Sequence, residues 1–118
     1  MSETTAPALT TERLDGEAAI VATRPRTTVD EHGLSVWFRL AVLVADGPTC
    51  WYDVTAAGVL ARNVVRSLEK GQRTVVSGPV KSSRTIGDDG SERVRRVLTL
   101  ERCGHDLSYG VASWRRAA

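Results

Sequence analysis

The sequence predicts an all-β domain with one helix, and three observations lead to this fold class. Apolar and polar residues alternate along most of the chain, as they do in strands with one buried face. One segment, residues 57–70, instead repeats its apolar residues every three or four positions, as a helix does. Residues 87–90, Gly-Asp-Asp-Gly, separate two alternating segments and predict the tip of a hairpin. A chain of 118 residues is long enough for one such domain.

The first third of the chain predicts a tail and two strands. Residues 1–12 are polar and lack periodicity, so we expect a flexible tail there and the folded domain over 13–116. Residues 17–28 predict a first strand that is interrupted at Pro25, and Gly33 opens a second strand. The second strand has an apolar face with Val36, Phe38, Leu40 and Val42, and an outward face with Trp37, Arg39 and Ala41.

Trp51 is the most informative residue of the third predicted strand, which follows a turn at residues 46–48. It shares one face of that strand with Asp53 and Thr55. The other face holds Cys50, Tyr52 and Val54. We therefore expect Trp51 to project away from the apolar core, where its ring is suited to stacking against a flat ligand.

Residues 57–70 predict a helix of about four turns. Its apolar stripe consists of Leu60, Ala61, Val64, Val65 and Leu68. Lys70 and Gly71 favour an end at residue 70, because a cation complements the negative end of the helix dipole and glycine readily adopts the left-handed conformation that follows many helices.

The last third of the chain predicts more strands. A fourth strand covers residues 73–80, and a hairpin pairs residues 81–85 with residues 93–102 around the 87–90 tip. The hairpin carries a series of basic residues: Lys81, Arg84, Arg93, Arg95 and Arg96. Residues 104–106 predict a turn, and residues 107–114 predict a short final strand.

The charges divide unevenly along the chain. Residues 1–33 carry a net charge of −3, whereas residues 34–118 carry +5. Of the sixteen basic residues, fourteen are arginine, which pairs with phosphate bidentately and stacks on rings. The excess falls short of the strongly basic footprint of many nucleic-acid binders. Charge alone is therefore compatible with an ordinary surface as well as with a phosphate-binding one.

Enzymatic, metal-binding and membrane functions are disfavoured by the motifs. The sequence lacks a phosphate loop, a dinucleotide glycine fingerprint and a nucleophile elbow, so we expect no enzyme, no catalytic residue and no cofactor. Among its cysteines and histidines only Cys103 and His105 are closely spaced, so we expect no metal site. No apolar run approaches the roughly 20 residues of a membrane span, and the start of the chain lacks an export signal. We expect a cytoplasmic protein without membrane association.

The predicted order of strand, strand, strand, helix, strand, strand is that of an OB fold, a five-stranded Greek-key barrel with a helix between strands 3 and 4. The chain also resembles the bacterial single-stranded-DNA-binding protein (SSB) family from about residue 17 to residue 114. The motifs that carry the resemblance are VWFRLAV at 36–42, WYDV at 51–54, GVLARNV at 58–64, LEKG at 68–71, VVSG at 75–78 and GHDL at 104–107. Each motif alone is weak evidence for the resemblance, but the motifs in this order and spacing are fairly specific to the family.

This resemblance implies binding of single-stranded DNA without sequence preference by a homo-oligomer, a dimer or tetramer, in DNA replication, recombination or repair at the nucleoid. Trp51 matches a position where the family stacks a base on tryptophan, and Trp37 offers an additional platform. Lys81 and Arg84 match basic positions of the hairpin that follows the DNA backbone. The side chains expected to neutralise phosphates are Arg39, Lys81, Arg84 and Arg96.

Some residues depart from the family pattern. Ala57 and Thr85 stand where the family often carries stacking aromatics, and Asp53 stands where it commonly has arginine. Each lost stack removes about 1–3 kcal/mol per base. The acidic C-terminal peptide of the family is not found, so the clients of that peptide are not expected as partners. The alternative interpretation is a protein-interaction OB module with little DNA affinity, in which Trp37 and Trp51 cover a subunit contact.

Overall fold

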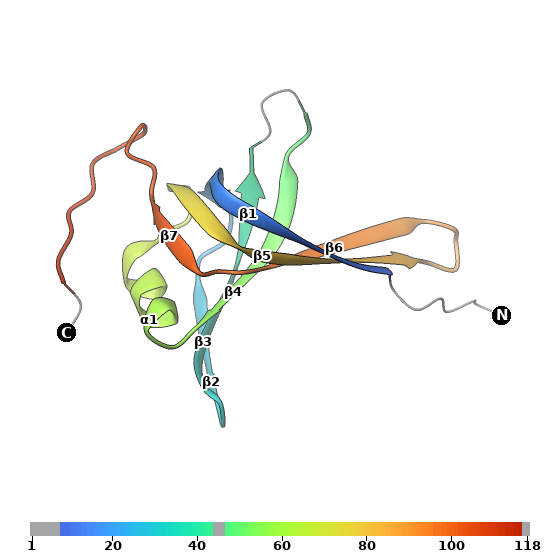
Figure 1. Cartoon of the computed structure of the whole chain (residues 1–118), viewed down its shortest axis with the longest axis horizontal. Coiled ribbons are helices and arrows are strands. Elements are labelled where there is room, and N and C mark those ends of the chain that lie inside the picture. Colours follow the sequence, from blue (N-terminus) through green and yellow to red (C-terminus); the bar gives the residue numbers. More distant parts are fainter. Residues whose placement is uncertain (1–7, 44–46, 117–118) are drawn as a thin grey trace.

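Figure 1 shows the computed structural model, which describes residues 8–43 and 47–116. These residues form seven strands and a single helix. The elements are β1 (Ala8–Val21), β2 (Arg26–Asp30), β3 (Gly33–Val42), β4 (Cys50–Ala57), α1 (Gly58–Ser67), β5 (Arg73–Ile86), β6 (Glu92–Thr99) and β7 (Arg102–His105). No helix in the described part of the chain is long and apolar enough to cross a membrane.

Five of the strands close into a ring in the order β1, β3, β4, β6 and β5, and β5 pairs back with β1. The pair β4–β6 is parallel, and the other pairs are antiparallel. Outside the ring, β2 forms a hairpin with β3, and β7 pairs with β5. Because α1 lies between β4 and β5, which are the third and fourth strands of the ring in chain order, the predicted OB fold is confirmed.

The core lies between the inner faces of the ring and α1. Val36, Leu40 and Val54 are completely buried on the inner faces of β3 and β4, as their alternation predicted. Ala61 and Val64 of α1 belong to the same apolar cluster. Full burial of a valine or leucine side chain stabilises the fold by about 1.5–3 kcal/mol, so this cluster holds the outward faces of β3 and β4 in place.

The strand β5 is longer than either of the two segments that the sequence predicted at residues 73–80 and 81–85. Its first part pairs with β7, and its last part pairs with β6 around the predicted tip. Figure 1 shows that this last part and β6 extend from the barrel as an arm. At the tip, Gly87 donates a backbone hydrogen bond to Ser91, and Ser91 donates to the Asp89 carboxylate at 2.6 Å from its hydroxyl. That hydroxyl lowers the pKa of Asp89.

The helix ends three residues before the predicted position. It stops at Ser67, because Leu68 takes an extended conformation and places its side chain in the core. The predicted helix end at Lys70 and Gly71 is therefore wrong. Gly71 does adopt a positive φ of +94°, but it does so in the following turn, where its N–H donates to the carbonyl of Val21 at 2.7 Å.

Both ends of the chain also differ from the prediction. β1 begins at Ala8, and residues 8–12, which were predicted as tail, pair with β5; residues 1–7 of that tail lie outside the described part. The final strand covers Arg102–His105, which includes part of the predicted 104–106 turn. The predicted strand at 107–114 is wrong, because β7 already takes the free edge of β5 and the residues after Asp106 have no strand beside them in the described structure.

Candidate nucleic-acid interface

The outward faces of β3 and β4 bring both predicted tryptophans to one surface, which we call the β3–β4 face. Trp37 is opposite Thr55 in the antiparallel register, and Trp51 is opposite Ala41. Trp37 is 41% exposed and Trp51 is 48% exposed, so the predicted outward position of both side chains is confirmed. Rings held on rigid strands with an open surface are suited to stacking on a flat partner.

Between the two tryptophans, the Asp53 carboxylate forms ion pairs with two arginines. Arg39 is its register partner on β3, and the Arg39 Nε lies 3.4 Å from Asp53 Oδ1. On the other side, the Nε–H of Arg95 donates to Asp53 Oδ2 at 3.1 Å. The Arg39 guanidinium also lies over the Trp51 ring, 5.2 Å from its centroid, within the range of a cation–π contact. The centre of the face is therefore a linked cluster of one carboxylate, two guanidinium groups and an indole.

Two shallow grooves meet at this cluster. One has a volume of about 460 Å³ and is lined by Arg39, Pro48, Thr49, Cys50, Trp51, Asp53, Val94, Arg95 and Arg96. The other has a volume of about 360 Å³ and is lined by Thr23, Arg24, Arg26, Trp37, Phe38, Arg39 and Asp53. Because Arg39 and Asp53 line both grooves, the two form one track with a tryptophan in each part. This track contains basic side chains along its whole length.

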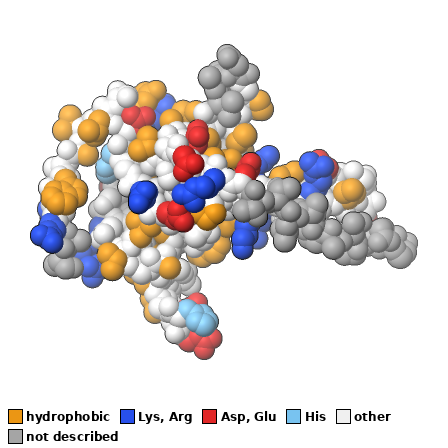
Figure 2. All heavy atoms as spheres, viewed as in Figure 1, with side chains coloured by type: hydrophobic (Ala, Val, Ile, Leu, Met, Phe, Trp, Pro, Cys, Tyr) orange, Lys and Arg blue, Asp and Glu red, His pale blue; other side chains and the backbone are white. Residues whose placement is uncertain are grey.

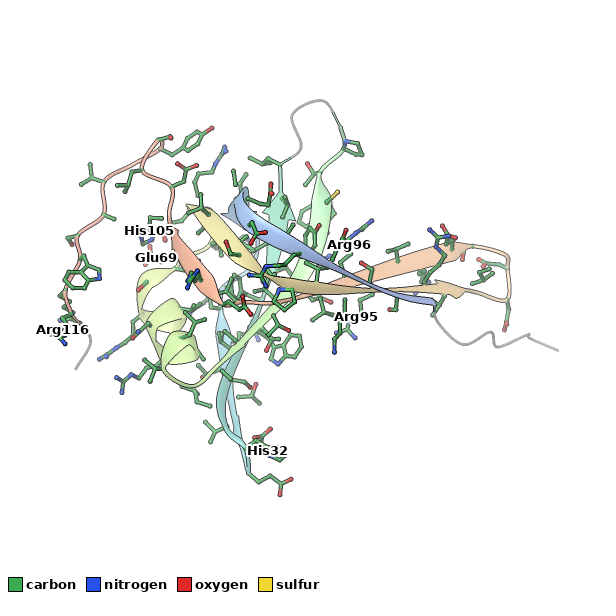
Figure 3. All side chains as sticks on the ribbon, in the orientation of Figure 1. His32, Glu69, Arg95, Arg96, His105 and Arg116 are labelled. Atoms are coloured by element: carbon green, nitrogen blue, oxygen red, sulfur yellow. The ribbon has the colours of Figure 1, made fainter. Side chains whose placement is uncertain are left out.

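The basic residues of the β5–β6 arm divide between its two faces. Register partners share a face, and neighbours along a strand alternate. Lys81 is therefore on the same face as Arg95, whereas Arg84 and Arg96 are on the opposite face. Figure 3 shows Arg95 and Arg96 on opposite sides of the arm, and Figure 2 shows Lys and Arg side chains on both sides of it.

The six residues that the sequence predicted for the site are thus not equally close to one another. Trp37, Arg39, Trp51 and Arg96 line the track, whereas Lys81 and Arg84 do not. Arg84 is also engaged within the arm, where its Nε lies 3.1 Å from Glu92 Oε2.

Sequence reasoning did not place Arg95, Arg24 or Arg26 in the site. The alternation along β6 puts Arg95 and Arg96 on opposite faces of that strand. Only the parallel pairing of β4 with β6 shows that the face with Arg95 is the one that contacts Asp53. Similarly, Arg26 lies beside Trp37 because β2 pairs with β3. These contacts follow from register, which periodicity alone does not determine.

Two other titratable side chains, Cys103 and His105, lie outside the track. Burial raises the pKa of the Cys103 thiol to about 11, so it is protonated at neutral pH. The His105 Nε2 lies 3.1 Å from both the Ser67 carbonyl and Gln72 Oε1. Across the described residues no group of three or more His, Cys, Asp or Glu side chains is placed to hold a metal ion.

A closed five-stranded barrel with an exposed track of aromatic and basic side chains defines this chain as an OB-fold protein of the kind that suits nucleic-acid strands. The model of the single-strand binding protein family matches residues 20–105, and the chain belongs to this family. The resemblance found in the sequence motifs is therefore confirmed.

Relatives and solved structures agree with this assignment. Single-stranded DNA-binding protein 1 of Streptomyces coelicolor is 37% identical over 108 residues, which cover 83% of this chain and 69% of the relative. Single-stranded DNA-binding protein 2 of Tropheryma whipplei is 31% identical over 106 residues, covering 80% and 69%. The crystal structure of the small single-stranded DNA-binding protein from S. coelicolor superimposes with a TM-score of 0.70 at 30% identity, covering 88% of this chain and 98% of that one. The second such protein of Mycobacterium smegmatis, at 23% identity and a TM-score of 0.66, supports the fold over 91% of this chain and 98% of its own.

Proposed function

We propose that this protein binds single-stranded DNA without sequence preference, along the track on the β3–β4 face. The observation that carries the proposal is the pair of exposed tryptophans, Trp37 and Trp51, in adjoining grooves lined by arginine, in a member of the single-strand binding protein family. Every base has a π-face, so stacking on indole tolerates any sequence. Binding is the whole activity in this proposal, and no bond is made or broken.

The proposed contacts divide between bases and phosphates. Trp51 and Trp37 each stack on a base. Arg39 and Arg96 line the track beside these rings and neutralise phosphates, and Arg95 joins them because it lines the same groove. Lys81 and Arg84 extend the positive charge along the arm, where the backbone of a longer strand would run.

The protein would act as a homo-oligomer, a dimer or a tetramer, over which the strand wraps. Four large apolar side chains support this assembly, because each is well exposed in the segment after β7: Leu107, Tyr109, Val111 and Trp114. The proposed setting is DNA replication, recombination or repair in the cytoplasm, at the nucleoid.

The test is a titration of the purified protein with oligo(dT) at low and moderate salt while tryptophan fluorescence is recorded. We expect quenching that saturates, with an affinity that falls as salt rises, because phosphate contacts release counterions. Oligo(dC) should bind similarly, and a duplex of equal length should bind more weakly, because its stacked bases are not available to the tryptophans. A protein that bound the duplex as well as oligo(dT), or bound neither, would contradict the proposal.

The second candidate is a protein-interaction module with little DNA affinity. The specific observation in its favour is that Asp53 already pairs with Arg39 and Arg95 at the centre of the track. Light scattering together with the same titration separates the two candidates. A stable oligomer that gave no quenching with oligo(dT) even at low salt would favour the interaction module.

A further inference from the structure

We infer that the Asp53 carboxylate competes with DNA phosphates for Arg39 and Arg95. This competition limits the affinity of the protein for single-stranded DNA. The inference deepens the proposed function and rests on it. In the free protein the Asp53 carboxylate is placed between Arg39 and Arg95, two cations that would otherwise be available to a phosphate of the DNA strand. The residue thus sets affinity, although it makes no favourable contact with DNA.

The geometry assigns each carboxylate oxygen to a different cation. Asp53 Oδ1 faces the Nε of Arg39 at 3.4 Å, and Oδ2 accepts from the Nε of Arg95 at 3.1 Å. β4 lies between β3 and β6 in the sheet, so the two arginines approach the carboxylate from opposite sides. A single negative charge at this position partly neutralises two positive charges at once.

The exposed fractions of the three side chains indicate which of them a DNA strand would contact. The Asp53 side chain is 30% exposed, whereas those of Arg39 and Arg95 are 52% and 64% exposed. The carboxylate is therefore less accessible to solvent than the two arginine side chains that pair with it. A phosphate that reaches either arginine comes close to a carboxylate of like charge, which opposes binding in this partly buried setting.

The same carboxylate also bears on stacking. Arg39 lies over the Trp51 ring at 5.2 Å, so one face of the indole is covered in the free protein. A base that stacks on that face must displace Arg39, and Asp53 helps to hold Arg39 there. A phosphate that draws Arg39 away from Asp53 would uncover the ring, so phosphate binding and base stacking are coupled through this one arginine.

Among the acidic residues that the structure describes, Asp53 alone lines the two grooves. Glu92 pairs with Arg84 on the arm, and Glu101 pairs with Arg13. Neither glutamate lines the two grooves of the track. Glu69 is the matched control, because it follows α1, where its N–H donates to Gln72 Oε1 at 2.9 Å, and it lines neither groove of the track.

The experiment compares Asp53→Asn with wild type in the oligo(dT) titration over a range of salt. At low salt we expect Asp53→Asn to bind about tenfold more tightly, a change that corresponds to about 1.4 kcal/mol. Its salt slope should be steeper by up to about 0.7, because an arginine freed from Asp53 neutralises one more phosphate of a single strand. The gain should shrink as salt rises, because counterions screen the charge that was removed.

Three further variants make the test specific. Asp53→Ser also removes the charge and should show the same gain in affinity. A gain in both variants would exclude an effect of the asparagine side chain or of the folding of that one variant. Asp53→Glu keeps the charge and should show no gain. Glu69→Gln changes the net charge of the protein equally but lies away from the track, so it too should show none.

The inference and the proposed function fail in different ways. If wild type binds oligo(dT) but Asp53→Asn and Asp53→Ser, with unchanged thermal unfolding, bind no more tightly, Asp53 is not a competitor and the function stands. An equal gain in Glu69→Gln would also overturn the inference, because net charge would then be sufficient. If neither wild type nor Asp53→Asn binds oligo(dT) at low salt, both the function and the inference are overturned.

Discussion

The β3–β4 face and the β5–β6 arm use their positive charges differently. On the face, Arg39 and Arg95 share the carboxylate of Asp53, and the two exposed tryptophans lie beside them. The arm has no aromatic residue between residues 81 and 99, and its cations are spread over both of its sides. One region thus combines charge with aromatic rings, whereas the other carries charge without aromatic rings.

This difference predicts that base stacking is confined to the face, whereas both the face and the arm contribute positive charge. Stacking releases no counterions and should depend little on salt, whereas phosphate contacts should depend on it strongly. We therefore expect tryptophan variants of the face to change mainly the affinity and the quenching. Variants of the arm should change mainly the dependence on salt.

The largest effect is expected at Gly78, which joins the two regions because β5 runs through it from the barrel into the arm. A Cβ at this position would collide with the carbonyl oxygen of Thr99 and lie 3.1 Å from its carbonyl carbon. Gly78→Ala should therefore lower the free energy of unfolding by about 1–3 kcal/mol or more, as overpacking does. Denaturant unfolding measures this loss.

The matched control for Gly78 is Gly110→Ala, because a Cβ at Gly110 would meet no atom within 4 Å. Its unfolding midpoint should stay near that of wild type. If Gly78→Ala unfolded at the wild-type denaturant concentration, β5 would not be held tightly where it leaves the barrel, and the arm could not be treated as a rigid extension of the ring.

The next effect concerns the face. Trp51→Ala should weaken oligo(dT) binding by about 1–3 kcal/mol and remove much of the quenching, with little change in the salt slope. Trp51→Phe keeps a flat ring and should recover a large part of the lost affinity. Fluorescence titrations at two salt concentrations measure both quantities. If Trp51→Ala instead left the affinity unchanged and dissociated the oligomer, the tryptophan would belong to a subunit interface.

Much of the fold followed from periodicity, because period-2 alternation reports directly which face of a strand is buried. The inner faces of β3 and β4 and the hairpin tip at residues 87–90 were predicted in this way and are confirmed. The end of α1 was not, because Leu68 fits the helical stripe and yet leaves the helix to reach the core. The apolar residues after β7 suggested a strand, but a strand also needs a neighbour, and none is present beside them in the described structure.

The site was only partly predictable for a similar reason. The outward position of Trp51 follows from alternation within one strand, and it was found. The cluster around Asp53 depends on which residues face one another across strands. Arg39 meets Asp53 through the β3–β4 register, and Arg95 meets it through a parallel pair of strands far apart in sequence. Composition carries no information about either pairing.

The smallest effects are expected on the arm, where Lys81 and Arg84 differ in their partners. Arg84 pairs with Glu92 at 3.1 Å, and both side chains are at least half exposed, so the pair itself contributes no more than about 1 kcal/mol to stability.

Lys81→Ala should flatten the salt slope by about 0.7, the loss expected for one phosphate contact on a single strand, and leave the quenching at saturation intact. Arg84→Ala should flatten it less, because Glu92 already neutralises part of that charge. Glu92→Gln should act in the opposite direction and steepen the slope. If Lys81→Ala reduced the quenching as Trp51→Ala does, charge and stacking would not be separated between the arm and the face.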